Sequence, residues 1–245
     1  YTCDAVILAN GSRASSVAGS GESGYQIAES LGHHLIEPLP ALTALKCRGN
    51  SFSGWSGVRT EGKITLYING TPVASQQGEL QLTDYGISGI PVFQISRYAI
   101  RAVHEKKAVE LSVNFFPELS SKELEEYLEH RRKDCPYKNE RELLTGIFPE
   151  KLIRILTAQR ELISAITDFR LSVKDGLSFE QAQVCSGGVD TSEVNSYSME
   201  SRLHRGLYFA GELLDIDGTC GGYNLQWAWS SGAVAGLHAA KEDNV

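Results

Sequence analysis

A buried strand joined to a helix by acids and glycines, near the C-terminus, is the feature that most restricts the fold of this chain. Residues 206–232 read GLYFAGELLDIDGTCGGYNLQWAWSSG. The continuous apolar run at its start predicts a strand covered on both faces, and a helix is expected over about 222–240. A strand that leads so directly into a helix is typical of an α/β sheet.

The first residues also predict a buried strand followed by a helix. The run DAVILA at 4–9 predicts a second strand buried on both faces. The apolar residues of 25–31 then lie at helical spacing, and Gly32 follows where a left-handed C-terminal cap is expected. The chain therefore opens as strand, glycine-rich loop and helix.

The middle of the chain has a different periodicity. From Glu37, alternating runs such as KITLYING and AVELSVNFFP are separated by turn residues, which indicates an antiparallel sheet or small barrel. The stretches around 54–58 and 84–98 remain unassigned. Ser120 with Glu123 forms a capping-box pattern, which predicts a helix from about 121. Further helices are expected after Pro149 and over 159–168.

This order of predicted strands and helices indicates one α/β domain interrupted by inserts. We assign 1–36 and 184–245 to the α/β domain, 37–119 and 166–183 to an antiparallel β-barrel-like insert, and 120–165 to a small helical insert.

Composition excludes several classes of protein. A formal net charge of −7 argues against nucleic acid as a partner, because phosphate binding needs a basic surface. The five cysteines are scattered and include no C-x-x-C pair, so neither a disulfide framework nor a zinc site is expected and a reducing cytoplasm fits best. No apolar run approaches the roughly 18 residues of a membrane span, and no signal peptide is evident.

The single methionine, Met199, and the start at Tyr1 lead us to expect a fragment of a longer chain. Removal of an initiator methionine normally exposes a small residue, and tyrosine is large.

Two motifs for ligand binding are weak. A formal G-x-G-x-x-G spans 19–24, but a polar connector separates it from the strand that should lead into it. Asp215 and Asp217 resemble the start of a calcium loop, which fails at Thr219, Cys220 and Gln226. No metal site is predicted.

A nucleophilic mechanism is also poorly supported. Cys185, Cys220 and Ser231 lie in no recognisable nucleophile context, so structural roles are expected for them. His33 and His34 are most simply the end of a helix, where cations are mildly favoured.

The connection at 210–225 is the strongest candidate site. Carboxylates at the end of a buried strand, Glu212 and Asp215, can accept hydrogen bonds from sugar hydroxyls. A helix that begins near Gly221, Gly222, Tyr223 and Asn224 offers free amides and a positive dipole end to a flat ligand. The alternative is a tight connection with solvated acids, and spacing alone leaves both open. We expect Trp229 to lie in the core.

The segment 183–236 closely resembles the C-terminal FAD-binding segment of the HI0933-like flavoproteins, the BaiN/RdsA family of NAD(P)/FAD-dependent oxidoreductases. Shorter matches are DAVILANGS (4–12), GSGESGYQIAESLGH (19–33), PLPALTALK (38–46) and GELQLTDYGISGIPVFQIS (78–96). The resemblance implies a partial FAD-binding domain of the two-dinucleotide-binding type, interrupted by a β-barrel that carries a helical insert. It further implies an oxidoreductase with FAD as cofactor, NAD(P)H as electron donor and a small-molecule substrate.

The resemblance also implies roles for individual residues. Gly11 matches the strand-end glycine near the adenosine half of the cofactor, and Glu212 and Asp215 match the acids near the ribityl and pyrophosphate part. The helix start at the isoalloxazine corresponds to Gly221, Gly222, Tyr223, Asn224 and Leu225. No catalytic acid or base is assigned.

The chain departs from the family pattern at three places. The usual strand-end A-T-G-G is Ala9-Asn10-Gly11-Ser12, which predicts a bulkier loop toward the cofactor, and Ser23 replaces the aspartate of GDGY. The βαβ unit with the true G-x-G-x-x-G has no match. We therefore expect weak or no FAD binding by residues 1–245 alone and self-association through exposed strand edges. A non-catalytic binding or scaffold protein that retains the fold is the second hypothesis.

Overall fold

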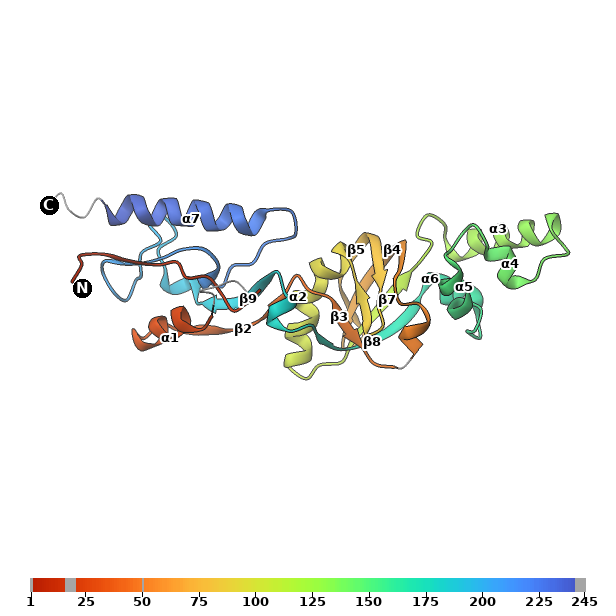
Figure 1. Ribbon diagram of the computed structural model, residues 1–245, viewed down its shortest axis with the longest axis horizontal. Coiled ribbons are helices and arrows are strands. Elements are labelled where there is room, and N and C mark those ends of the chain that lie inside the picture. Colours follow the sequence, from red (N-terminus) through yellow and green to blue (C-terminus); the bar gives the residue numbers. More distant parts are fainter. Residues whose placement is uncertain (1, 16–20, 50, 241–245) are drawn as a thin grey trace. The chain divides into compact units, whose positions relative to one another are not determined.

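The structure is a computed structural model that describes residues 2–15, 21–49 and 51–240 (Figure 1). The chain divides into two compact units. The first joins Tyr1–Thr43 with Leu177–Val245, and the second is Ala44–Gly176. The helices between 121 and 167 belong to the same unit as the strands around them.

The second unit contains a closed barrel. Its strands are β3 (Leu45–Cys47), β4 (Val58–Ile68), β5 (Thr71–Leu82), β6 (Gly86–Ser88), β7 (Val109–Asn114) and β8 (Phe169–Gly176). They follow the order β3-β6-β5-β4-β7-β8, and every pair is antiparallel. The alternating patterns point Ile64, Leu66 and Leu111 inward, where each is fully buried. The predicted antiparallel barrel is confirmed.

A helix, α2 (Ile90–His104), occupies much of the stretch around 84–98 that the sequence left unassigned, and it continues to His104. Its apolar face, which includes Val92, Ile95 and Ala99, is buried, and the helix packs on β4, β5 and β8. The helix is rich in isoleucine and valine, which favour strands locally, but burial of its helical stripe decides the outcome.

Four helices separate β7 from β8: α3 (Ser121–Asp134), α4 (Glu140–Leu144), α5 (Glu150–Leu156) and α6 (Leu162–Thr167). The Ser120 side chain accepts a hydrogen bond from the Glu123 amide, and the Glu123 side chain reaches back to the Ser120 amide, which confirms the predicted capping box. A 3₁₀ turn, η1 (Ser51–Gly54), follows β3.

The described residues of the first unit form two strand pairs and two helices. β1 (Val6–Leu8) pairs in parallel with β10 (Leu207–Phe209), and β2 (Leu35–Ala41) pairs antiparallel with β9 (Val184–Val189). The helices are α1 (Ser23–Ser30) and α7 (Tyr223–Ala239), and the 3₁₀ turns are η2 (Phe179–Gln181), η3 (Thr191–Glu193) and η4 (Gly211–Leu213).

The end of α1 is the predicted glycine cap. Gly32 has φ +83°, its amide donates to Glu29 O, and the His33 amide donates to Ala28 O.

The two paired strands of this unit differ in burial. β10 is buried along its length, but Val6 and Ile7 of β1 are 42% and 39% exposed. The expectation that β1 is covered on both faces was wrong. Among the described residues β10 is its only strand partner, so one edge of β1 is left without a neighbour.

A large apolar cluster packs within the first unit. It draws its residues from α1, β9, β10, η4, α7 and the loop before β10, and its buried members include Tyr25, Ala28, Val189, Met199, Tyr208, Phe209, Leu213 and Ala235. No helix in the described part of the chain is long and apolar enough to cross a membrane.

Candidate functional site

Gly211 at the end of β10 fixes the start of η4 against α7. Its amide donates to Ser231 Oγ at 2.9 Å, and its carbonyl accepts from Trp227 Nε1 at 3.0 Å. A side chain at Gly211 would contact Ala228, so the helix approaches the backbone closely here. Small residues on this face of α7 therefore pack closely, and Ala235 is fully buried.

Glu212 is held by two segments that are distant in the sequence. Its Oε1 accepts from Ser12 Oγ at 2.8 Å and from the Cys185 amide at 2.7 Å. Ser12 lies in the loop after β1 and Cys185 in β9, so three strands contribute to one carboxylate. Burial raises the pKa of Glu212, while these two hydrogen bonds lower it and the nearby Asp217 raises it further.

The residues beneath Glu212 form a small buried cluster. Ser12 is 3% exposed, and Tyr25 and Cys185 are buried beside it. Burial raises the pKa of the Cys185 thiol and of the Tyr25 hydroxyl, so both groups are neutral near pH 7. This supports the structural role expected for Cys185.

Asp215 lies further along the same connection and is half-buried. Its amide donates to Val189 O at 3.0 Å, which joins the connection to the end of β9. Gly188 permits this contact, because a side chain there would lie 2.6 Å from Leu213 O.

The start of α7 is open to a ligand. Gly222 is its N-cap and offers no capping side chain, so among the described residues no side chain caps the first amides. Gly221 and Gly222 have φ +117° and +91°. Tyr223 and Leu225 are 65% and 61% exposed.

Asn224 has a structural role in this region. Its Oδ1 accepts from the Gly218 amide at 2.7 Å, and its Nδ2 donates to Gly218 O at 3.2 Å. The side chain therefore folds the acid-rich loop onto α7, and any contact with a ligand at this position would come from the backbone.

Trp229 is 68% exposed, so the expectation of a core position was wrong. The buried face of α7 carries Ser231 and Ala235, and helical geometry puts Trp229 on a different face.

The structure brings some predicted site residues together directly. Gly11, with φ +72°, precedes Ser12 and so adjoins Glu212, while Gly211 joins Glu212 to α7.

Sequence reasoning missed Ser12, Tyr25 and the Cys185 amide. Ser12 was expected to make the loop bulkier toward a cofactor, but its side chain is buried and directed to Glu212. The carboxyl ends of parallel strands meet at one edge, so the pairing of β1 with β10 was the signal that could have identified Ser12.

His33 lies just after the end of α1, as the sequence predicted, but its contacts reach beyond that helix. Its ring is buried, with Nδ1 2.9 Å from Glu193 Oε2 and Nε2 2.9 Å from Ser201 Oγ. His34 Nδ1 contacts the other oxygen of Glu193. The pair therefore joins the end of α1 to η3 and to the loop before β10.

Other candidates add no site. Gly19 and Ser20 of the G-x-G-x-x-G lie outside the described residues. Within residues 2–15, 21–49 and 51–240, no group of three or more histidine, cysteine or acidic side chains is arranged to hold a metal ion.

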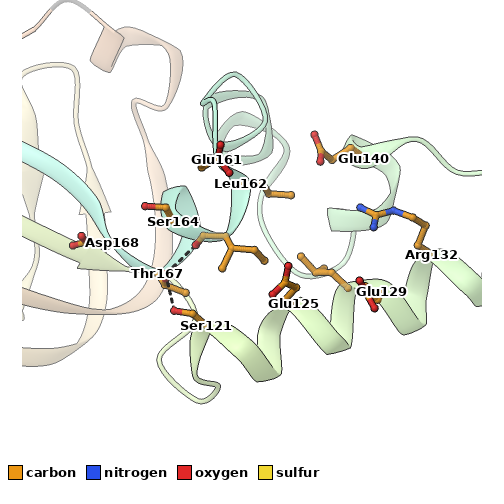
Figure 2. Close-up of a pocket in the computed structure, with 12 residues that line it drawn as sticks. Ser121, Glu125, Glu129, Arg132, Glu140, Glu161, Leu162, Ser164, Thr167 and Asp168 are labelled. Atoms are coloured by element: carbon orange, nitrogen blue, oxygen red, sulfur yellow. Dashed lines mark hydrogen bonds between the residues drawn. The ribbon is translucent and has the colours of Figure 1, made fainter.

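A groove of about 620 Å³ lies among the helices of the second unit (Figure 2). Four exposed glutamates line it, together with Arg132 and Asp168: Glu125, Glu129, Glu140 and Glu161. Ser121 and Thr167 also line it, and Ser121 Oγ donates to Thr167 Oγ1 (Figure 2). Acids that are exposed in this way are typical of a solvated surface, and none of the predicted site residues lies here.

A parallel strand pair with polar residues at its carboxyl edge, covered by α7 and accompanied by a closed antiparallel barrel, defines a Rossmann-like protein with a barrel insert. Residues 1–238 match the family model described as HI0933-like protein Rossmann domain, and the chain belongs to the HI0933-like family.

Three curated relatives are similar to this chain. A 3-dehydro-bile acid delta(4,6)-reductase of Clostridium scindens is 43% identical over 98% of this chain and 63% of its own length. Ribosomal RNA dihydrouridine synthases of Escherichia coli and Haemophilus influenzae are 32% and 29% identical, over 94% and 99% of this chain and 59% and 62% of their own lengths. The chain thus spans about three fifths of the length of these relatives.

Proposed function

We propose that the first unit binds the sugar chain and ring of a flavin, in an FAD-dependent oxidoreductase that takes electrons from NAD(P)H. The observation that carries this proposal is Glu212. One of its oxygens is held by Ser12 and Cys185, the other has no hydrogen bond to a described residue, and the uncapped start of α7 follows in the same connection. Family membership and the 43% identical reductase support it.

The residues fit such a ligand. The open oxygen of Glu212 would accept a ribityl hydroxyl, with Asp215 as a second acceptor, and Gly11 would lie near the adenosine half. The free amides and positive dipole end of α7 would stabilise negative charge on the ring, beside the exposed Tyr223 and Leu225. A bound flavin supplies hydride transfer through its N5.

The proposed substrate is a small molecule. The net charge of −7 disfavours a polyanion such as RNA, and the relative named a bile acid reductase is more similar than the two named for ribosomal RNA. A 3-dehydro-bile acid is therefore the first substrate to test.

The exposed Val6 and Ile7 of β1 support the expected self-association of this chain.

A binding experiment tests the proposal. Purified residues 1–245 are titrated with FAD and with riboflavin, which lacks the pyrophosphate and adenosine, and flavin fluorescence is followed. Residues 1–245 contain no match to the family's βαβ unit with its G-x-G-x-x-G, which would hold the pyrophosphate. We therefore expect weak binding, with similar dissociation constants for both ligands. Glu212→Gln should weaken both by roughly 10-fold or more, the scale of a hydrogen bond to a charged group. Glu129→Gln, on the exposed surface of α3, is the control.

The outcomes separate the hypotheses. No binding of either ligand would favour the non-catalytic scaffold. Tight, stoichiometric FAD retained through purification would contradict the expected weak binding. If binding is found, bleaching of the bound flavin by NADH or NADPH identifies the electron donor.

A further inference from the structure

Ser12 occupies an unusual position for a serine after a strand end. It is 3% exposed, and its Oγ donates to Glu212 Oε1 at 2.8 Å while accepting from the Ala14 amide at 3.1 Å. A hydroxyl carries one proton, so that proton is committed to the carboxylate. The Ala14 amide fixes the rotation of the hydroxyl in turn.

The Glu212 carboxylate is thereby divided into two different oxygens. Oε1 receives two donors, Ser12 Oγ and the Cys185 amide. Oε2 has no hydrogen bond to a described residue. It is also not one of the fully buried polar atoms that lack a partner, so it is accessible from outside. A carboxylate oxygen in this position can accept a hydrogen bond, and a sugar hydroxyl is a suitable donor.

The surroundings explain why this arrangement matters. Burial beside Tyr25 and Cys185 raises the pKa of Glu212, and Asp217 acts in the same direction. The nearby guanidinium of Arg13 acts in the opposite direction on Tyr25, because its positive charge lowers the pKa of that hydroxyl. The Ser12 hydroxyl opposes the effect of burial, because it stabilises the charged form.

We propose that Ser12 is a positioning residue for the sugar-chain acceptor: its hydroxyl holds Oε1 of Glu212 so that Oε2 remains available to a ligand hydroxyl. This inference rests on the proposed function. The position is a glycine in the A-T-G-G pattern of the resembling family, so the hydroxyl is a feature of this chain. Specificity would follow, since a ligand that covers this oxygen without offering a hydroxyl leaves the acceptor unsatisfied.

The test compares Ser12→Ala with Ser96→Ala. Ser96 is also fully buried, but it donates to Phe93 O within α2 of the second unit. Two quantities are measured for each: the dissociation constant for riboflavin, and the pKa of Glu212 by ¹³C NMR of the ligand-free chain. We expect Ser12→Ala to weaken riboflavin binding roughly 5- to 10-fold, the scale of one hydrogen bond, and to raise the pKa of Glu212. Ser96→Ala should change neither.

Each outcome is decisive. If the wild type binds riboflavin and Ser12→Ala changes neither quantity, the inference is wrong and the proposed function stands. If the wild type binds neither riboflavin nor FAD, the proposed function fails, and the pKa of Glu212 alone decides whether Ser12 holds the carboxylate. Ser12→Gly, which restores the family residue, provides a second variant should Ser12→Ala fail to fold, with the same expected changes.

Discussion

The two units of this chain are stabilised in different ways. In the barrel, each strand from β3 to β8 pairs with two neighbours, so its backbone groups are satisfied by adjacent strands. The first unit has only two separate strand pairs among the described residues. Side chains from distant parts of the sequence join its loops instead, in the contacts of Glu212, of Glu193 and of Asn224.

This difference shows where a ligand acceptor can be built. A closed barrel filled by apolar side chains leaves few polar groups free, whereas loops at strand ends present carboxylates and amides that are already oriented. The first unit should therefore be less stable locally, and stabilised more strongly by a ligand, than the barrel.

The largest expected effect comes from emptying the barrel core. Leu111→Ala removes a fully buried side chain from β7 and should reduce the free energy of unfolding by about 2–5 kcal/mol. Urea unfolding measures the loss, and hydrogen exchange with mass spectrometry should localise it to β4, β7 and β8. Val73→Ala, on the exposed side of β5, is the control and should cost less than about 0.5 kcal/mol. A loss below about 1 kcal/mol for Leu111→Ala would contradict the view that core packing stabilises the barrel.

A smaller effect is expected where the backbone of the first unit is crowded. Gly188 has φ +145°, and a side chain there would lie 2.6 Å from Leu213 O. Gly188→Ala should destabilise the first unit by about 1–3 kcal/mol, because it strains the junction between β9 and the Glu212 connection. Gly232→Ala is the matched control: it lies within α7 with nothing in contact, and alanine there should stabilise the helix by up to about 1 kcal/mol. Equal effects of the two substitutions in thermal unfolding would rule out the crowding.

The local part of the fold could be predicted from the sequence. The Ser120 capping box, the Gly32 cap, the barrel strands and the start of α7 near 222 all depend on neighbours within a few residues, and the structure confirms them. Glu212 was identified because it follows a strand directly. Its role as a ligand acceptor remains a proposal.

What the sequence could not reveal depends on long-range contacts. Ser12 and Glu212 are 200 positions apart, and His33 and Glu193 are 160 apart. No periodicity or spacing connects such residues, so the sequence predicted only a bulkier loop at Ser12 and the end of a helix at His33, without their partners. The exposure of Val6 and Trp229 has the same cause, since burial depends on which elements cover a face.

The smallest expected effect concerns the pH dependence of the first unit. Hydrogen bonding to Glu193 raises the pKa of His34 above its ordinary 6.5, and Asp190 adds to this. The same contact lowers the pKa of Glu193 below its ordinary 4.5. The ion pair is therefore fully formed between about pH 4.5 and 6.5. Its contribution is lost as pH rises through the raised pKa of His34, and as pH falls through the lowered pKa of Glu193.

His34→Ala should thus destabilise the chain near pH 5.5 and have a smaller effect near pH 9, where less of the wild-type imidazole is protonated. His34 is fully exposed, so the effect is small, and comparing the two pH values isolates it from any change in packing. Urea unfolding of both proteins at each pH measures it. His130→Ala, an exposed histidine of α3, is the control and should show no such pH-dependent difference. An equal destabilisation by His34→Ala at both pH values would show that the contact with Glu193 acts as a neutral hydrogen bond, and that charge does not help to hold α1 to η3.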